Sequence, residues 1–379
     1  MRQWSRTDNG DEVLGSLIRL AADFSKKELS ERREAHDCFP FGPFWTEVVE
    51  RAFDVGFFGI SIPEECGGSG LGVGALAFVL EEMGRTDASL AAVIFTHAAA
   101  HEIMHAASED ADGRDTYRAL AAHPKKPVAF QPYATSGDEI GPVAGTASGR
   151  TLLSGSASNL VLGGLAGFAV VPARDPEKDG FSYYLLDLKG SGIELSEPVI
   201  CLGLHACPAV DAVLNSAEGL LLGGHGKGPD YFQRMYRRMS LPAAAISLGI
   251  MKGSFSEALS YARDRYQGGR QIIDWPALRM ILSEMAAQIE TGHASLDRAA
   301  GLLESASPGW EAAAAAAALE IGEASVRVAT DGVQVLGGNG YMKDYGQEKR
   351  MRDAAQARAL LGITGVRRLA LIAEMTGEL

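Results

Sequence analysis

The hydrophobic pattern of this 379-residue chain changes its period twice, and this limits the folds open to it. Apolar residues recur at helical spacing in residues 1–126, form short strand-like runs in 127–225, and return to helical spacing in 226–379. The regular alternation of strands and helices that a doubly wound nucleotide-binding fold needs is absent. The pattern therefore predicts an α+β chain of three domains, in which a central β-barrel or sandwich separates an N-terminal helical domain from a C-terminal helical bundle.

Particular segments carry this division. One helix is predicted by five apolar residues on one face, and Gly56 just beyond them can end it. An unbroken alanine run at 312–318 predicts a bundle helix, because alanine is the strongest helix former. The two clearest helical stripes are Trp45, Val48, Val49, Ala52 and Phe53, and Leu278, Ile281, Leu282, Met285 and Ile289. The predicted strands include residues 151–153, 168–171, 181–186 and 210–214.

Charge and composition exclude several classes of function. With 35 Lys and Arg against 48 Asp and Glu, the net charge is −13, which argues against binding nucleic acid or an anionic membrane face. The sequence contains no run of about 18 apolar residues, the length that a helix needs to span a bilayer. Residues 1–12 are polar and lack the apolar core of a secretory leader. Four cysteines in this length suit a reducing compartment, so we expect a cytoplasmic protein.

A histidine-rich segment matches the H-E-x-x-H pattern of zinc hydrolases at His101, Glu102 and His105. On a helix, this spacing places two imidazoles one turn apart with the carboxylate as a base, and His97 extends the row. The alternative interpretation is a histidine-bearing helix face that packs against another element. Because the third downstream ligand is not apparent, we favour this interpretation and predict no metal site.

Several stretches resemble motifs of the acyl-CoA dehydrogenase family, in the same order and at similar spacing. They are GISIPEECGGSGLG at 59–72, RYQGGR at 265–270, QVLGGNGY at 334–341 and EKRMRDA at 348–354. In addition, GLHAC at 203–207 stands where the family usually has G-x-R-x-S.

This resemblance implies an N-terminal helical domain, a central β domain and a C-terminal four-helix bundle. It also implies FAD as cofactor, an acyl-CoA thioester as substrate, a role in fatty acid metabolism, and a homotetramer or dimer. In the family, a carboxylate removes the α-proton of the acyl group while a hydride passes from the β-carbon to the flavin. The electrons then leave to an electron-transfer flavoprotein.

The chain departs from the family around the reacting centre. Counted from Arg352 and Asp353, the usual catalytic carboxylate falls on Leu361, which cannot accept a proton. The alternative position that some members use lies near Met239, beside Arg237 and Arg238, and carries no carboxylate either. Two stretches that contact the flavin in the family are also altered, at residues 133–138 and at 159–162, where Asn159 and Val161 replace the usual residues.

The retained residues are those that, in the family, reach the diphosphate and adenine end of the neighbouring subunit's FAD. They are Arg265, Gln334, Gly337 and Gly338. An arginine can bind a diphosphate through its planar fork, and glycine lets the backbone approach closely. The plainer alternative for Arg265 is a solvated cation at a helix end, and we prefer the cofactor role.

Three hypotheses follow from these departures. The first is a FAD-dependent acyl-CoA dehydrogenase whose base comes from elsewhere, with His97 as the candidate because its helix lines the family's acyl pocket. A neutral imidazole is a competent base near neutral pH. The second is a non-catalytic subunit that completes the FAD site of a base-bearing paralogue. The third is a zinc hydrolase through His101, Glu102 and His105.

Overall fold

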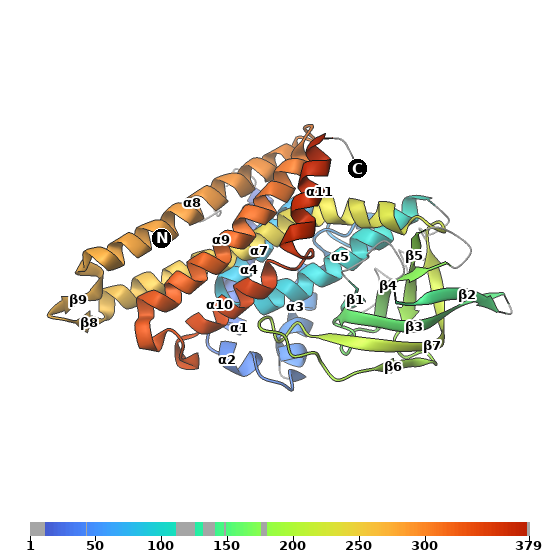
Figure 1. The fold of residues 1–379 in the computed structure, drawn as a ribbon, viewed down its shortest axis with the longest axis horizontal. Coiled ribbons are helices and arrows are strands. Elements are labelled where there is room, and N and C mark those ends of the chain that lie inside the picture. The colour runs from blue at the N-terminus through green and yellow to red at the C-terminus, as the bar shows by residue number, and fades with distance from the viewer. Residues whose placement is uncertain are drawn as a thin grey trace.

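The computed structural model describes residues 12–42, 44–110, 126–131, 141–147, 149–175 and 180–376. Long helices extend to one end of the molecule, and a β sheet lies at the other (Figure 1). This is the predicted order of helical, β and helical regions. The stretch around Tyr133 and Asp138, where the sequence departs from the family motif, lies outside the described residues.

The N-terminal region is helical. It contains α1 (Glu12–Glu28), α2 (Arg33–His36), the π-helical turn η2 (Phe44–Val49), α3 (Glu50–Val55), the short turns η3 (Phe57–Gly59) and η4 (Glu64–Cys66), α4 (Gly72–Thr86) and α5 (Ala88–Asp110). The stripe that begins at Trp45 spans η2 and α3, and its end at Gly56 is confirmed. Gly56 has a φ of 92°, which favours glycine.

The central region is a closed barrel. Its strands are β1 (Val128–Phe130), β2 (Val143–Ala147), β3 (Arg150–Val161), β4 (Phe168–Arg174), β5 (Phe181–Asp187), β6 (Ile193–Leu195) and β7 (Ala209–Leu222). β3 pairs with β7, β7 with β5, β5 with β4, and β4 returns to β3 through β1. All four segments predicted as strands lie in these elements. Most pairs are antiparallel, whereas β4 pairs in parallel with β1 and β2.

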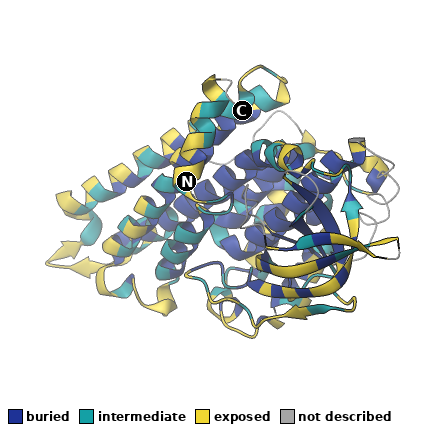
Figure 2. Ribbon diagram, turned by 45° about the vertical axis from the view of Figure 1, so that its right-hand side comes forward, coloured by how far each residue is buried: buried dark blue, intermediate teal, exposed yellow. Residues whose placement is uncertain are grey.

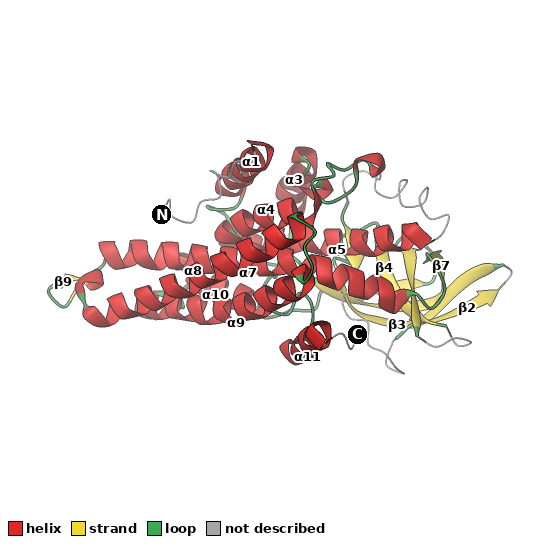
Figure 3. Ribbon diagram, turned by 90° about the horizontal axis from the view of Figure 1, so that it is seen from above, coloured by secondary structure: helices red, strands yellow, loops and turns green. Residues whose placement is uncertain are grey.

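The C-terminal region is the expected bundle. It consists of α7 (Gly228–Asp264), α8 (Pro276–Glu304), α9 (Trp310–Leu336) and α10 (Gln347–Ala357), followed by α11 (Thr364–Thr376). A small hairpin, β8 (Tyr266–Gln267) and β9 (Arg270–Gln271), and the turn η5 (Ile272–Asp274) connect α7 to α8. The turns η6 (Gly337–Asn339) and η7 (Lys343–Tyr345) connect α9 to α10. Seen from above, α8, α9 and α10 lie alongside α7 (Figure 3).

Glycines join the N-terminal helices closely to the bundle. A Cβ on Gly249 of α7 would lie 2.2 Å from the carbonyl oxygen of Glu81 in α4, and one on Gly253 would lie 2.2 Å from that of Arg85. Only residues without a side chain allow α4 and α7 to cross at this distance. At the same crossing Lys252 donates to Glu81 at 2.5 Å in buried surroundings. Among the described residues, no helix is both long and apolar enough to span a membrane.

Candidate active site

A largely apolar pocket lies where the barrel meets the helices, and we call it the central pocket. α5 contributes Phe95, Thr96 and Ala99, and the end of β3 contributes Asn159 and Val161. The other walls come from Phe232 and Met235 of α7, the connection 199–209, and Leu360 and Leu361 after α10. Burial increases towards this junction, as the dark blue of Figure 2 shows. Such a pocket binds an apolar group away from water.

Leu361 lies in the wall of the central pocket. Its exposed fraction is 7%, and it is placed there by the turn that follows α10. None of the described residues that line this pocket is an aspartate or a glutamate. The position that the resemblance assigns to the base is therefore inside the pocket, but its side chain cannot accept a proton.

Two titratable side chains that line the pocket are constrained by burial or by hydrogen bonds. Burial raises the pKa of Cys207 to about 12, which keeps this thiol protonated at neutral pH. His205 uses both ring nitrogens: Nε2 lies 2.9 Å from the carbonyl oxygen of Cys201, and Nδ1 lies 3.2 Å from a carboxylate oxygen of Asp37. His205 therefore fastens the pocket wall to α2.

The connection 199–209 is held against α10 by residues of the EKRMRDA stretch. The backbone N–H of Leu204 donates to Asp353 at 2.7 Å, and Lys349 donates to the other oxygen of Asp353 at 2.6 Å. Lys349 also contacts Asp87 at 3.2 Å. Burial alone would lower the pKa of Lys349, but the carboxylates around it raise that pKa above its usual value. Sequence reasoning did not assign this clamp, although Lys349 and Asp353 stand at the i, i+4 spacing of helical ion pairs.

His97, the candidate base, does not line the central pocket. It faces a second cavity together with Phe53, Phe58 and Val128. Another face of the same helix, α5, lines the central pocket. Burial holds the pKa of His97 well below its usual range, and His101 adds to this.

The hydrogen bond of His97 also fixes its proton. The backbone N–H of Val128 donates to Nδ1 at 3.1 Å, so the neutral ring carries its proton on Nε2. A second proton would have to bind Nδ1, where its N–H would face the Val128 N–H, and two donors cannot form a hydrogen bond with each other. The base role of His97 remains a prediction that this geometry disfavours.

The three residues of the H-E-x-x-H pattern have different surroundings and do not face a common point. Arg238 donates to Glu102 at 2.6 Å, and His105 lies 3.7 Å from Glu109. Burial lowers the pKa of His101 to about 3. In the described parts of the chain, no three histidine, cysteine or acidic side chains converge in a way that could hold a metal ion. The structure thus gives the zinc hypothesis no support.

The alternative base position on α7 holds Met239, and the charged residues beside it form ion pairs. Met239 is fully buried, and its neighbours Arg237 and Arg238 form ion pairs with Glu374 and Glu102. Glu102 is a buried carboxylate, and it is engaged by the ion pair with Arg238, the sequence neighbour of Met239.

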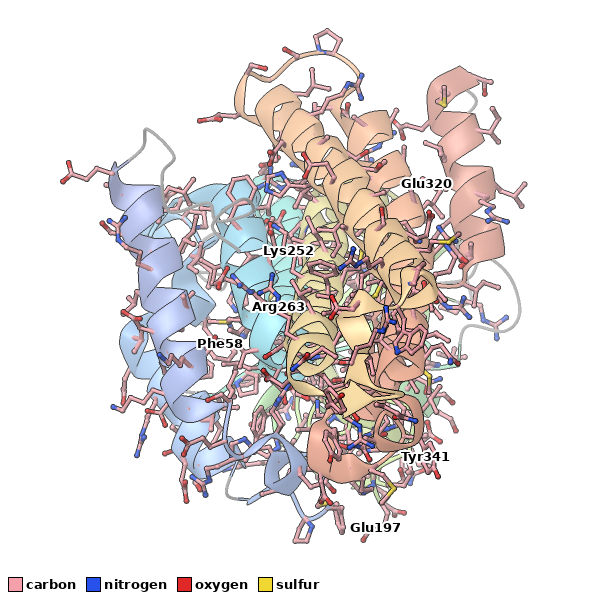
Figure 4. The ribbon with its side chains drawn as sticks, turned by 90° about the vertical axis from the view of Figure 1, so that its left-hand side faces the viewer. Phe58, Glu197, Lys252, Arg263, Glu320 and Tyr341 are labelled. Atoms are coloured by element: carbon pink, nitrogen blue, oxygen red, sulfur yellow. The ribbon has the colours of Figure 1, made fainter. Side chains whose placement is uncertain are left out.

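The residues expected at the diphosphate lie together at the opposite end of the bundle from the barrel. Arg265 follows α7, and Gln334, Gly337 and Gly338 lie where α9 ends; all four are exposed. The two ends are joined by a hydrogen bond of 2.9 Å from Asn339 to the hydroxyl of Tyr261. This end faces the viewer in Figure 4, where Tyr341 is labelled beside it.

Both places fit parts of FAD. The apolar walls of the central pocket suit a flat ring system. At the bundle end, Gly337 has a φ of 58°, and no atom lies within 4 Å of where a Cβ on Gly337 or Gly338 would stand. The backbone there is open to a ligand, and Arg265 provides an exposed cation for a diphosphate.

Comparisons with known proteins agree with these observations. A family model described as acyl-CoA dehydrogenase, C-terminal domain, matches residues 226–376, and one for the N-terminal domain matches residues 14–115. An acyl-CoA dehydrogenase of Bacillus subtilis is 27% identical, covering 95% of this chain and 97% of that protein. The caffeyl-CoA reductase-Etf complex subunit CarC of Acetobacterium woodii is 28% identical, covering 89% and 91%. The structure of butyryl-CoA dehydrogenase from Megasphaera elsdenii has a TM-score of 0.86 at 22% identity, covering 96% and 98%.

Proposed function

The chain belongs to the acyl-CoA dehydrogenase family of FAD-dependent oxidoreductases, and on this premise we propose that it binds an acyl-CoA thioester in the central pocket. There it takes part in α,β-dehydrogenation or a variant of that reaction. The observation that carries the proposal is the apolar pocket enclosed by α5, the end of β3, α7 and the residues after α10. When bound, FAD would accept the hydride that leaves the β-carbon.

The side chains of this chain have three tasks in the proposed reaction. Phe95, Phe232 and Met235 bind the apolar acyl group and exclude water from it. The clamp of Lys349 and Asp353 keeps the connection 199–209 in place as a wall. Arg265, with the backbone at Gly337, binds the diphosphate of a FAD held by a neighbouring subunit.

The proton acceptor distinguishes this chain from the usual reaction. Leu361 lies where the carboxylate is expected. The α-proton must therefore pass either to another group of this chain or to a group outside it. His97 is the sequence-based candidate, and its hydrogen bond with Val128 counts against it.

A second candidate function is favoured by the leucine at position 361. A subunit with no carboxylate among the described residues of its pocket, but with an open cationic site at the bundle end, suits a hetero-oligomer. In that assembly the chain completes the FAD site of a base-bearing paralogue and catalyses nothing in its own pocket. Electrons leave to an electron-transfer flavoprotein in either case.

The absorbance spectrum of the purified protein separates these two functions. A catalytic flavoprotein is yellow when purified alone, and the right member of a panel of acyl-CoA thioesters bleaches its flavin band under anaerobic conditions. A non-catalytic subunit is colourless or weakly loaded alone and gains colour on co-expression with a base-bearing paralogue. A protein that takes up no FAD in either preparation would contradict both.

A further inference from the structure

The second cavity, which His97 faces, is a separate space with walls of its own. Its volume is about 480 Å³, within the range of roughly 300–1,000 Å³ that is usual for small-molecule sites. Its walls come from α3 and the turn after it, from α5, and from the barrel strands β1, β4 and β5. Thr96 lines the central pocket and its neighbour His97 lines the second cavity, so a single helix separates the two spaces.

The interior of the second cavity is aromatic. Phe53 and Phe58 stack with their ring centroids 3.6 Å apart, and Phe168 at the start of β4 also lines the space. His97 meets the two stacked rings edge-on, with centroids 5.8 and 5.2 Å away. Phe58 is labelled in Figure 4. Such walls suit a flat apolar ring, because aromatic pairs add stacking or edge-to-face attraction to the burial of apolar area.

The same walls offer polar groups to a ligand. His97 is only 5% exposed, and its Nδ1 accepts from Val128. No hydrogen bond from Nε2 is found within the described part of the chain, so this N–H can donate to an oxygen or to the face of a ring. Gly56 and Gly67, with φ of 92° and 87°, have no atom within 4 Å of where a Cβ would stand, so the backbone there borders open space.

Two lysines meet at the rim of the second cavity. The Cδ atom of Lys126 lies 3.8 Å from where a Cβ on Gly167 would stand, so the lysine stem packs over this glycine. The carbonyl oxygen of Gly167 accepts from Leu188 at 3.0 Å, which places Lys189 beside the same edge. Both lysines are exposed, and neither pairs with a carboxylate of the described residues. Asp187, the acidic residue of the rim, accepts from the backbone N–H of Lys189 at 3.0 Å.

We propose that the second cavity binds an aromatic carboxylate, with its ring against Phe53, Phe58 and Phe168 and its carboxylate at Lys126 and Lys189. An inorganic anion would leave the apolar interior unfilled, and a neutral aromatic molecule would leave the two ammonium groups without a partner. This site goes beyond the proposed reaction and does not depend on it.

The test is isothermal titration calorimetry on the full-length protein, with FAD if it binds. Two probes of the same shape are compared: 2-naphthoate, which carries the carboxylate, and 2-naphthamide, which is uncharged. The double variant Lys126→Gln and Lys189→Gln removes the two rim charges. The matched control is Lys27→Gln and Lys227→Gln, which removes two charges from lysines that are 80% and 53% exposed elsewhere. Circular dichroism verifies that each variant is folded.

We expect the wild type and the control to bind 2-naphthoate about fivefold or more tightly than 2-naphthamide, as two exposed ion pairs allow. In the rim variant the two probes should bind alike, because the charge that distinguishes them has lost its partners. A wild type that binds neither probe, or a rim variant that keeps the full preference for 2-naphthoate, would overturn the proposal.

A third variant shows which of the two spaces the probe occupies. Leu361→Glu places a negative charge in the wall of the central pocket, where it would repel 2-naphthoate. Because α5 separates the second cavity from that wall, we expect the Kd for 2-naphthoate to change less than twofold. If this variant does not fold, Leu360→Glu in the same wall replaces it. A loss of binding in the folded variant would assign the probe to the central pocket and overturn the proposal.

Discussion

The two ends of α10 lie in very different surroundings. In its first two turns, Lys349, Arg350 and Asp353 are buried charges that pair with one another and with acidic residues just after α2, just before α5 and in α7. Just beyond its end, Leu360 and Leu361 face the central pocket with aliphatic side chains. The charged end fixes how α10 packs in the fold, whereas the apolar end carries a leucine where the resemblance places the catalytic carboxylate. The residues that set the packing of α10 and the position that the family uses for its reaction thus lie about a dozen residues apart in this chain.

Lys349→Met should have the largest effect on the charged end. It leaves Asp87 and Asp353 buried without their cation, which costs about 3–5 kcal/mol of the free energy of unfolding. Denaturant titration measures the change. Arg279→Ala, which breaks an exposed pair with Asp274, is the control and should cost less than about 1 kcal/mol. A loss below 1 kcal/mol for Lys349→Met would remove the contrast between the two ends.

Acid should weaken the same end. Burial alone would raise the pKa of Glu257, but the ion pairs with Arg350 and Arg33 lower it to about 2. Because the pKa is lower in the folded protein, this stabilisation is present above about pH 4.5 and is lost as the pH falls towards 2. The loss for wild type is at most about 3 kcal/mol. Glu257→Gln should flatten this part of the stability profile in denaturant titrations between pH 5 and 2, and a slope equal to that of the wild type would exclude the assignment.

Arg265→Ala should weaken FAD binding without affecting stability. A charged hydrogen bond contributes about 1.5–3 kcal/mol, so the Kd for FAD rises about tenfold or more. Quenching of flavin fluorescence measures the Kd, with Arg279→Ala as a control for loss of charge near the same end of the bundle. Equal affinity in both variants would favour the plain interpretation of Arg265 as a solvated cation.

His97→Asn should have the smallest effect. The amide oxygen of asparagine can still accept the Val128 N–H, so we expect the rate of flavin reduction by an acyl-CoA thioester to change less than about threefold. Stopped-flow absorbance gives the rate. If reduction is abolished while the variant remains folded and binds FAD, His97 is the base.

The fold was largely predictable because its signals are local. The stripe from Leu278 to Ile289 and the alanine run of α9 are helical, and the short runs of 127–225 became the strands of a closed barrel. The site was less predictable because it depends on side-chain direction. His97 and Thr96 are neighbours on α5, yet only Thr96 lines the central pocket. The hydrogen bond from Lys349 to Asp87 joins residues 262 positions apart, and no local pattern indicates that contact.

The central claim is that position 361 lies at the reacting centre and lacks a proton acceptor. It is tested most directly by the anaerobic rate of flavin reduction in Leu361→Glu, with Leu360→Glu as the neighbouring control. General-base catalysis contributes about 10²–10⁴-fold, so we predict at least a hundredfold faster reduction in Leu361→Glu than in the wild type and no such gain in the control. Equal rates in wild type and Leu361→Glu, with FAD and acyl-CoA both bound, would contradict the account.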